Sequence, residues 1–128
     1  MKIILDTHTF LWFVAGNPKL SSQAQKLIET PDNQRLLSIA SAWEIAIKLS
    51  LGKLKLAGRF EDLIPHQLQF NDITLLPITP EHLATVAELP FHHRDPFDRL
   101  IIAQAVTEKI PVITTDQAFA SYKIEKLW

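Results

Sequence analysis

Four acidic side chains stand where the chain is expected to pass between strands and helices: Asp6, Glu44, Asp98 and Asp116. Asp6 and Asp116 directly follow short apolar runs that predict buried strands. Glu44 and Asp98 fall in the first turns of two predicted helices. In a parallel sheet, strands end and crossover helices begin at the same edge, so the four carboxylates are expected to meet there.

A cluster of carboxylates can bind a hard divalent cation. Like charges held close together repel each other unless some are protonated or a cation neutralises them. Mg²⁺ and Mn²⁺ prefer oxygen ligands and retain bound waters. Such an ion polarises a phosphate oxygen and lowers the pKa of a water, which is the chemistry of phosphodiester hydrolysis. The acids alone leave open whether one ion or two would bind.

Each acid also has a simpler structural interpretation. Asp6 could be only a cap after its strand, and Glu44 could be only the partner of Ser41 in a capping box. Asp98 could only stabilise its helix dipole, and Asp116 could only be a turn residue. The common placement of all four favours a functional site, and it depends on the predicted strands.

Short apolar runs alternate along the chain with longer helical patterns. Strands are predicted at 2–5, 35–39, 73–78 and 111–115, with a further edge strand at 122–127. Helices are predicted to open at Thr7, at 20–22, at Ser41, at Arg59, at Thr79-Pro80 and at Asp95-Pro96. This alternation predicts an α/β fold with a mostly parallel sheet and helices on both faces.

The composition fits one folded domain over residues 1–128. Of these residues, 47% are hydrophobic and 21% are charged, which excludes a disordered chain. The net charge of -1 argues against a strongly basic nucleic-acid binder, although not against a local basic patch. The absence of cysteine excludes disulfides, zinc–thiolate sites and thiol catalysis. No apolar stretch reaches the roughly twenty residues of a membrane span, so we expect a cytoplasmic protein.

In order and spacing, four segments of the chain resemble the PIN-domain ribonucleases, and within them the VapC-like toxins of type II toxin–antitoxin systems. The segments are 3–8, 38–48, 95–105 and 113–116. The resemblance implies a three-layer α/β/α sandwich and a Mg²⁺- or Mn²⁺-dependent endoribonuclease. It also implies a VapB-like antitoxin as partner, operator DNA bound only through that antitoxin, and a homodimer.

The resemblance also gives roles to individual residues. The acids of the family fall on Asp6, Glu44, Asp98 and Asp116, which we expect to be catalytic. We expect Asp6, Asp98 and Asp116 to bind the metal, while Glu44 would be a ligand or would position the attacking water. The small hydroxyl residue that precedes the last acid in the family matches Thr114.

Contacts to the substrate are expected from three side chains near the acids: Arg99, Lys48 and Thr114. Lys48 belongs to a basic cluster with Lys53, Lys55 and Arg59, which could guide an RNA backbone or could be an ordinary solvated face. Arg99 could touch a substrate phosphate or could be an exposed arginine on the helix surface.

Other polar and aromatic side chains near these segments have expected positions of their own. His92 and His93 are expected on a loop surface, and His8 could line the groove beside Asp6. Asp95 could share the metal, although a helix cap is the simpler interpretation. Trp43 is expected in the core. The remaining histidines, His66 and His82, are expected on helix surfaces.

Two other functions would use the same acids differently. A small-molecule phosphohydrolase with a phosphoaspartyl mechanism favours an acid two residues after Asp6, where this chain has His8. A non-catalytic RNA- or protein-binding module would use the acids only as helix caps. The acids do not specify which RNA is cut, because RNA is recognised through loops, shape and flanking contacts.

Overall fold

A parallel sheet with strand order β3-β2-β1-β4-β5 runs through the middle of the computed structural model, which describes residues 1–56 and 58–128. The strands are β1 (Lys2–Leu5), β2 (Gln34–Ser38), β3 (Ile73–Leu76), β4 (Val112–Ile113) and β5 (Lys126–Leu127). β1 lies at the centre, with Ile4 beside Leu36 of β2 and Val112 of β4. The strand pairs of the described ranges are all parallel, as the alternating pattern predicts.

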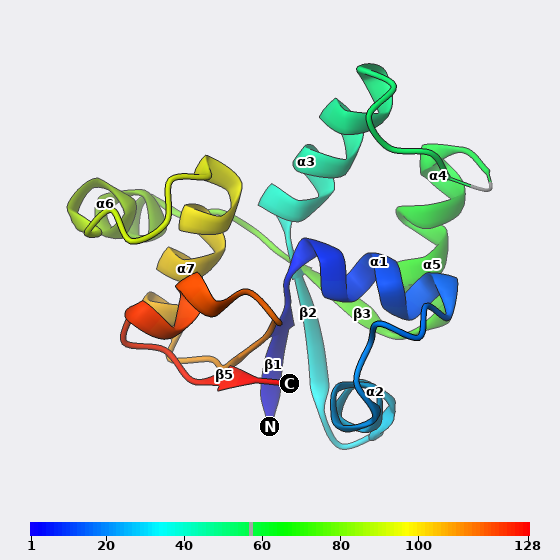
Figure 1. Cartoon of the computed structure of the whole chain (residues 1–128), viewed down its shortest axis with the longest axis horizontal. Coiled ribbons are helices and arrows are strands. Elements are labelled where there is room, and N and C mark those ends of the chain that lie inside the picture. The colour runs from blue at the N-terminus through cyan, green and yellow to red at the C-terminus, as the bar shows by residue number, and fades with distance from the viewer. Residues whose placement is uncertain (57) are drawn as a thin grey trace.

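Helices cover both faces of this sheet and give the three layers of an α/β/α sandwich (Figure 1). They are α1 (Thr7–Ala15), α2 (Ser22–Glu29), α3 (Ile39–Ser50), α4 (Phe60–Leu63), α5 (His66–Phe70), α6 (Pro80–Glu88), α7 (Pro96–Glu108) and the 3₁₀ helix η1 (Gln117–Ser121). Side chains of β1 alternate between the two faces. Ile3 and Leu5 pack with residues of α1, α2 and α5, whereas Ile4 packs with residues of α7. Burial of each such side chain stabilises the fold by about 1.5–3 kcal/mol.

Two predicted helix starts are wrong in detail. Asp6, not Thr7, is the N-cap of α1, and its carboxylate accepts a hydrogen bond from the Thr9 backbone N–H at 2.7 Å. Ser38, not Ser41, caps α3, so Ser41 lies inside the helix. Both caps come from the residue that ends or follows a strand, so the chain turns directly from strand to helix.

The other boundaries follow the proline and glycine signals closely. Gly16 ends α1 in the left-handed conformation, and Thr79 and Asp95 are the N-caps of α6 and α7. The helix predicted at 59–70 is divided into α4 and α5 at Pro65, because proline has no N–H to continue a helix. The predicted edge strand at 122–127 is shortened to β5. Among the described helices, none has both the length and the apolar character that a membrane crossing requires.

Candidate active site

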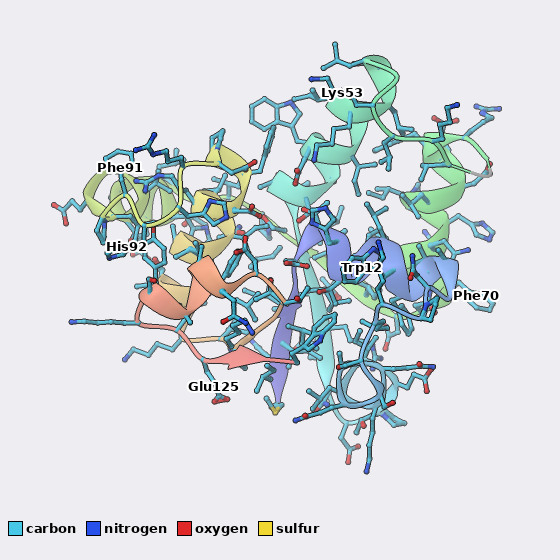
Figure 2. The ribbon with its side chains drawn as sticks, viewed as in Figure 1. Trp12, Lys53, Phe70, Phe91, His92 and Glu125 are labelled. Carbon is cyan, nitrogen blue, oxygen red and sulfur yellow. The ribbon has the colours of Figure 1, made fainter. Side chains whose placement is uncertain are left out.

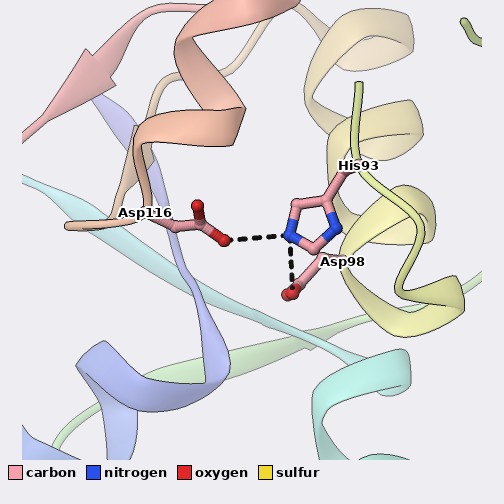
Figure 3. A group of neighbouring side chains, drawn as sticks. All are labelled: His93, Asp98 and Asp116. Carbon is pink, nitrogen blue, oxygen red and sulfur yellow. Dashed lines mark hydrogen bonds and ion pairs between the residues drawn. The ribbon is translucent and has the colours of Figure 1, made fainter. Parts of the chain in front are cut away.

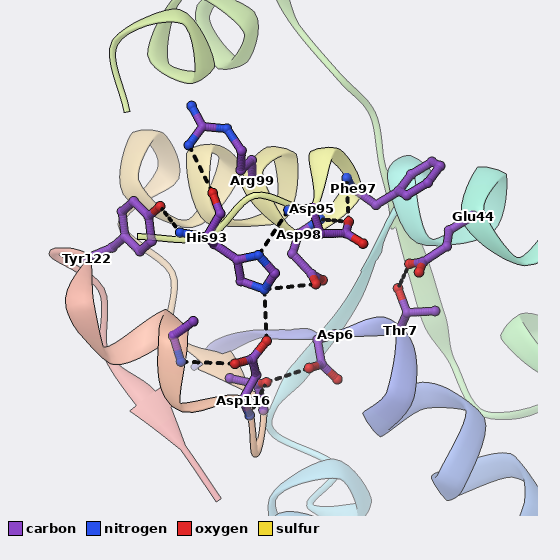
Figure 4. Close-up of polar contacts among 12 residues, drawn as sticks. Asp6, Thr7, Glu44, His93, Asp95, Phe97, Asp98, Arg99, Asp116 and Tyr122 are labelled. Atoms are coloured by element: carbon purple, nitrogen blue, oxygen red, sulfur yellow. Dashed lines mark hydrogen bonds and ion pairs between the residues drawn. The ribbon is translucent and has the colours of Figure 1, made fainter. Parts of the chain in front are cut away.

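The ends of β1 and β4 and the N-terminal parts of α3 and α7 meet at one edge of the sheet (Figure 4). This edge carries the predicted acids: Asp6 after β1, Glu44 in α3, Asp98 in α7 and Asp116 after β4. Glu44 lies in the second turn of its helix rather than the first, because α3 begins at Ile39. The topology therefore brings together carboxylates that are widely separated in the sequence.

Asp6 and Asp116 each use one carboxylate oxygen as a helix cap and turn the other toward the site. Asp6 Oδ1 accepts from the Thr9 backbone N–H at 2.7 Å, and Asp116 Oδ1 accepts from that of Ala118 at 2.9 Å. The Thr114 hydroxyl donates to Asp6 Oδ2 and accepts from the Asp116 backbone N–H at 3.0 Å. The capping and site interpretations of these two acids are therefore compatible.

Asp98 is the acid on which the negative charge of the site has the clearest effect. Burial, followed by the neighbouring charge of Asp95, raises the pKa of the Asp98 carboxyl to about 7, and the charges of Glu44 and Asp6 act in the same direction. Asp95 itself caps α7, since its Oδ1 accepts from the backbone N–H groups of Phe97 and Asp98 at 2.8 and 3.0 Å.

Glu44 is a fixed carboxylate on the α3 side of the site, with a residue exposure of 3%. Its Oε1 lies 2.8 Å from Thr7 Oγ1, and its Oε2 lies 2.8 Å from the Lys48 ammonium. Ser41 Oγ lies 2.9 Å from Thr7 Oγ1, so the predicted capping box between Ser41 and Glu44 is wrong. The hydrogen bond to Glu44 raises the pKa of Lys48, which therefore stays positively charged.

His93 completes the cluster, although it is predicted on a loop surface. Its Nε2 lies 3.1 Å from Asp98 Oδ2 and 2.9 Å from Asp116 Oδ2 (Figure 3). The prediction is wrong because the loop folds inward, leaving the side chain 14% exposed. The available signal was its place just before the Asp95-Pro96 helix start, which brings the loop to the same edge of the sheet.

The carboxylate oxygens of the cluster fit a hard divalent cation. One carboxylate oxygen of Asp98, one of Asp116 and one ring nitrogen of His93 all lie within 4.8 Å of one another. Carboxylate oxygens are the ligands that Mg²⁺ and Mn²⁺ prefer. The raised pKa of Asp98 means that ionising this carboxylate among its neighbours costs free energy, and a bound cation would lower that cost.

Two residues expected to contact substrate are buried in the protein. Arg99 is 6% exposed, and its guanidinium donates to the backbone carbonyls of Val86, Leu89, Pro90 and His93. The alternative of an exposed arginine is therefore wrong, and the bonded guanidinium does not fit a substrate contact. Thr114 is fully buried, and its hydroxyl holds Asp6 instead of facing the substrate.

The predicted positions of Trp43 and His82 are wrong, whereas those of two other histidines are confirmed. Trp43 is 59% exposed rather than in the core, and its ring packs edge-on against Phe97 with the ring centres 5.2 Å apart. His82 is 1% exposed rather than on the helix surface, and its Nδ1 accepts from the Thr79 backbone N–H at 3.0 Å. His66 and His92 are exposed, as expected.

A cavity of about 570 Å³ lies between α1 and the segment that follows α3. Its lining includes apolar side chains of α1 and α3, such as Leu11, Trp12 and Ile45, together with Thr7 and His8. The predicted basic cluster, Lys48, Lys53, Lys55 and Arg59, also lines it. Two of the lining side chains, Trp12 of α1 and Lys53 after α3, can be followed in Figure 2. Since Thr7 and Lys48 contact Glu44, the cavity adjoins the acidic site.

Comparison with known proteins gives the class that this fold and site define. The family model of the PIN domain matches residues 3–125, so the chain belongs to the PIN-domain family. A curated relative is Ribonuclease VapC22 of Mycobacterium tuberculosis, which is 29% identical over 126 residues and aligns over 94% of this chain and 92% of its own.

Solved structures support the same fold at low sequence identity. VapBC2 from Rickettsia felis, bound to a promoter DNA fragment, contains a chain with a TM-score of 0.73 and 14% identity, covering 99% of this chain and 98% of that one. VapBC-1 from nontypeable Haemophilus influenzae gives a TM-score of 0.66 and 16% identity over 99% and 97% of the two chains. These similarities confirm the predicted α/β/α sandwich.

Proposed function

We propose that the chain is a Mg²⁺- or Mn²⁺-dependent endoribonuclease, formed by one domain over residues 1–128, and the toxin of a type II toxin–antitoxin pair. The observation that carries the proposal is the meeting of Asp6, Glu44, Asp98 and Asp116 at one edge of the sheet. Membership of the PIN-domain family and similarity to a ribonuclease support RNA as the substrate.

Asp6, Asp98 and Asp116 would hold the ion. When bound, a divalent ion polarises a phosphate oxygen and makes a water more acidic. The chain contributes fixed geometry, since the caps on α1 and η1 and the Thr114 hydroxyl restrict rotation of the Asp6 and Asp116 carboxylates. Asp98 lies opposite them at the start of α7, and its raised pKa shows that its ionisation costs free energy that a bound cation would lower.

Glu44 would contact the attacking water, and Lys48 would contact the substrate. Both Glu44 oxygens have partners within the protein, so this carboxylate keeps one orientation and can accept a hydrogen bond from an attacking water. The Lys48 side chain is 40% exposed beside the basic cavity, where its ammonium can contact a phosphate. Of the three side chains expected to contact substrate, we therefore propose Lys48 alone, because Arg99 and Thr114 are buried.

The proposed partners are a VapB-like antitoxin, a second copy of this chain in a homodimer, and operator DNA reached only through the antitoxin. Solved VapBC assemblies of the same fold support the antitoxin, and one of them is bound to promoter DNA. The proposed location is the cytoplasm, where RNA and such a partner would meet the chain.

The test is to induce the chain in cells without its partner and to map new 5′ ends in total RNA. Asp6→Asn is the control, because asparagine can still cap α1 while the site loses a charge. We expect new ends at discrete positions with the wild type and none with Asp6→Asn. Absence of new ends, or the same ends from both proteins, would count against the nuclease. Hydrolysis of small phosphate esters alone would favour a phosphohydrolase.

A further inference from the structure

His93 has no role in the function proposed so far, yet its imidazole lies inside the acidic cluster. We infer that His93 is a positioning residue whose Nε2–H donates to both Asp98 and Asp116 and so sets how these two carboxylates face each other. The inference rests on the proposed function only for its consequence in catalysis. Its basis is the hydrogen-bond geometry of the described residues.

The ring contacts determine which nitrogen carries the proton. His93 Nδ1 accepts a hydrogen bond from the Asp95 backbone N–H at 3.2 Å, so this nitrogen presents a lone pair. An imidazole that keeps a lone pair on Nδ1 carries its proton on Nε2. Nε2 lies 2.9 Å from Asp116 Oδ2 and 3.1 Å from Asp98 Oδ2, and carboxylates only accept. One N–H is therefore shared between two carboxyl groups.

Hydrogen bonds from Tyr122 and Arg99 hold the loop that carries His93 in place. The Tyr122 hydroxyl accepts from the His93 backbone N–H at 2.9 Å and donates to the Pro90 carbonyl at 2.7 Å. Arg99 donates to the carbonyls of His93 at 3.3 Å and Pro90 at 3.0 Å.

Aromatic contacts hold the same loop. The His93 ring packs at 87° against Phe119 of η1, with the ring centres 5.8 Å apart. The Arg99 guanidinium carbon lies 4.1 Å from the centre of the Phe91 ring. Figure 4 shows the polar contacts of this loop with Tyr122 and Arg99. Together, the hydrogen bonds and the ring packing fix the backbone position from which the imidazole reaches the acids.

The same geometry argues against His93 as a metal ligand. Ligation through Nε2 requires a lone pair there, which moves the proton to Nδ1. Nδ1–H would then point at the Asp95 N–H, and two donors would face each other in a half-buried site. Held as a donor, the imidazole orients Asp98 and Asp116 while leaving their other lone pairs for a cation. Residues that orient ligands in this way affect metal affinity strongly.

The first test reads the tautomer directly. The chain is labelled with ¹⁵N-histidine and the ring nitrogens are measured by long-range ¹H–¹⁵N correlation, with His93→Gln used to assign the signals. We expect the Nε2–H tautomer in the metal-free protein and the same tautomer at saturating Mg²⁺. An Nδ1–H tautomer in either state, or loss of the Nε2 proton when Mg²⁺ is added, would overturn the inference.

The second test uses two amides of different reach. Glutamine places its amide nitrogen near the position of Nε2 and can donate to the acids, whereas asparagine reaches only as far as Nδ1. Mn²⁺ binding, followed by the spin-resonance signal of free Mn²⁺, is expected to weaken about 10- to 100-fold in His93→Asn and far less in His93→Gln. Equal weakening in both variants, with both shown to be folded by thermal unfolding, would contradict the inference.

Failure of this inference and failure of the proposed function give different results. A wild type that cuts RNA with Mg²⁺ while His93→Asn keeps its Mn²⁺ affinity would leave the nuclease intact and remove the role of His93. A wild type that cuts no RNA, with the tautomer and affinity differences as expected, would remove the nuclease and leave the role of His93 intact.

Discussion

The Thr114 hydroxyl donates a hydrogen bond to the Asp6 carboxylate and joins two strand ends that are 108 residues apart in the sequence. The same hydroxyl accepts from the Asp116 backbone N–H at 3.0 Å. Thr114 is fully buried, so neither bond has water as a ready replacement. One side chain therefore fixes the relative positions of two acids in the candidate site.

Replacing this hydroxyl by a methyl group tests that link. In Thr114→Val the shape is kept, but the Asp6 oxygen and the Asp116 N–H each lose a buried partner. We expect a loss of about 1–3 kcal/mol in the free energy of unfolding, measured by urea denaturation, together with slower RNA cleavage. Thr114→Ser keeps the hydroxyl and is the matched control. Equal loss of activity in both variants would contradict a role for the hydrogen bond.

Much of this site could be predicted from the sequence because three of its four acids directly follow a strand or lie in the first turn of a helix. Asp6 and Asp116 follow apolar runs, and Asp95-Pro96 marks the helix that carries Asp98. What remained undecided was whether such acids cap helices or serve chemistry. The structure shows that Asp6 and Asp116 cap helices with one oxygen each and leave the other at the site.

The environments of His93, Arg99 and Trp43 could not be predicted, because they depend on contacts between distant segments. His93 meets Asp116 across 23 residues, and Trp43 meets Phe97 of another helix. Arg99 is buried where the last turn of α6 and the loop after it direct four carbonyls toward its guanidinium. Periodicity gives the face of a helix but not which loop covers it.

Binding of a divalent cation should stabilise the fold relative to the metal-free protein, because the cation relieves repulsion among the acids. The Tm of the wild type is expected to rise with Mg²⁺ or Mn²⁺. The corresponding gain in the free energy of unfolding is about 2.7 kcal/mol at a cation concentration 100 times Kd. Asp98→Asn removes the carboxylate whose ionisation is most disfavoured, so this variant should be at least as stable without metal and should respond little to it. A full response in Asp98→Asn would contradict this placement of the ion.

Arg99 should be essential to the fold rather than to substrate binding. In Arg99→Lys a single ammonium cannot reach the carbonyls that the guanidinium fork satisfies, and we expect a loss of roughly 2–4 kcal/mol in unfolding free energy. Arg94→Lys changes an exposed arginine of the loop before α7 that makes none of these bonds, and it should be neutral. Unfolding in denaturant compares the two, and equal stability would contradict the buried role of Arg99.

The basic cavity should contribute charge to RNA binding. Neutralising Lys53 and Lys55 together as glutamines is expected to weaken binding of single-stranded RNA and to reduce the slope of log K against log salt by about 0.7 for each phosphate that is no longer neutralised. Binding would be measured by fluorescence anisotropy in EDTA. Glutamines at Lys26 and Lys123, two exposed lysines that do not line this cavity, are the control and should leave the slope unchanged.

The most direct test of the metal-dependent site is the cleavage rate of purified protein, freed of any partner, on RNA as a function of Mg²⁺ concentration. The wild type should cut RNA only with Mg²⁺ or Mn²⁺ and should stop when a chelator is added. Asp98→Asn, verified as folded, should be slower by more than about 100-fold, since loss of even an orienting neighbour of a metal ligand costs roughly 10- to 100-fold. Undiminished cleavage in chelator, or wild-type rates from Asp98→Asn, would contradict the proposed nuclease.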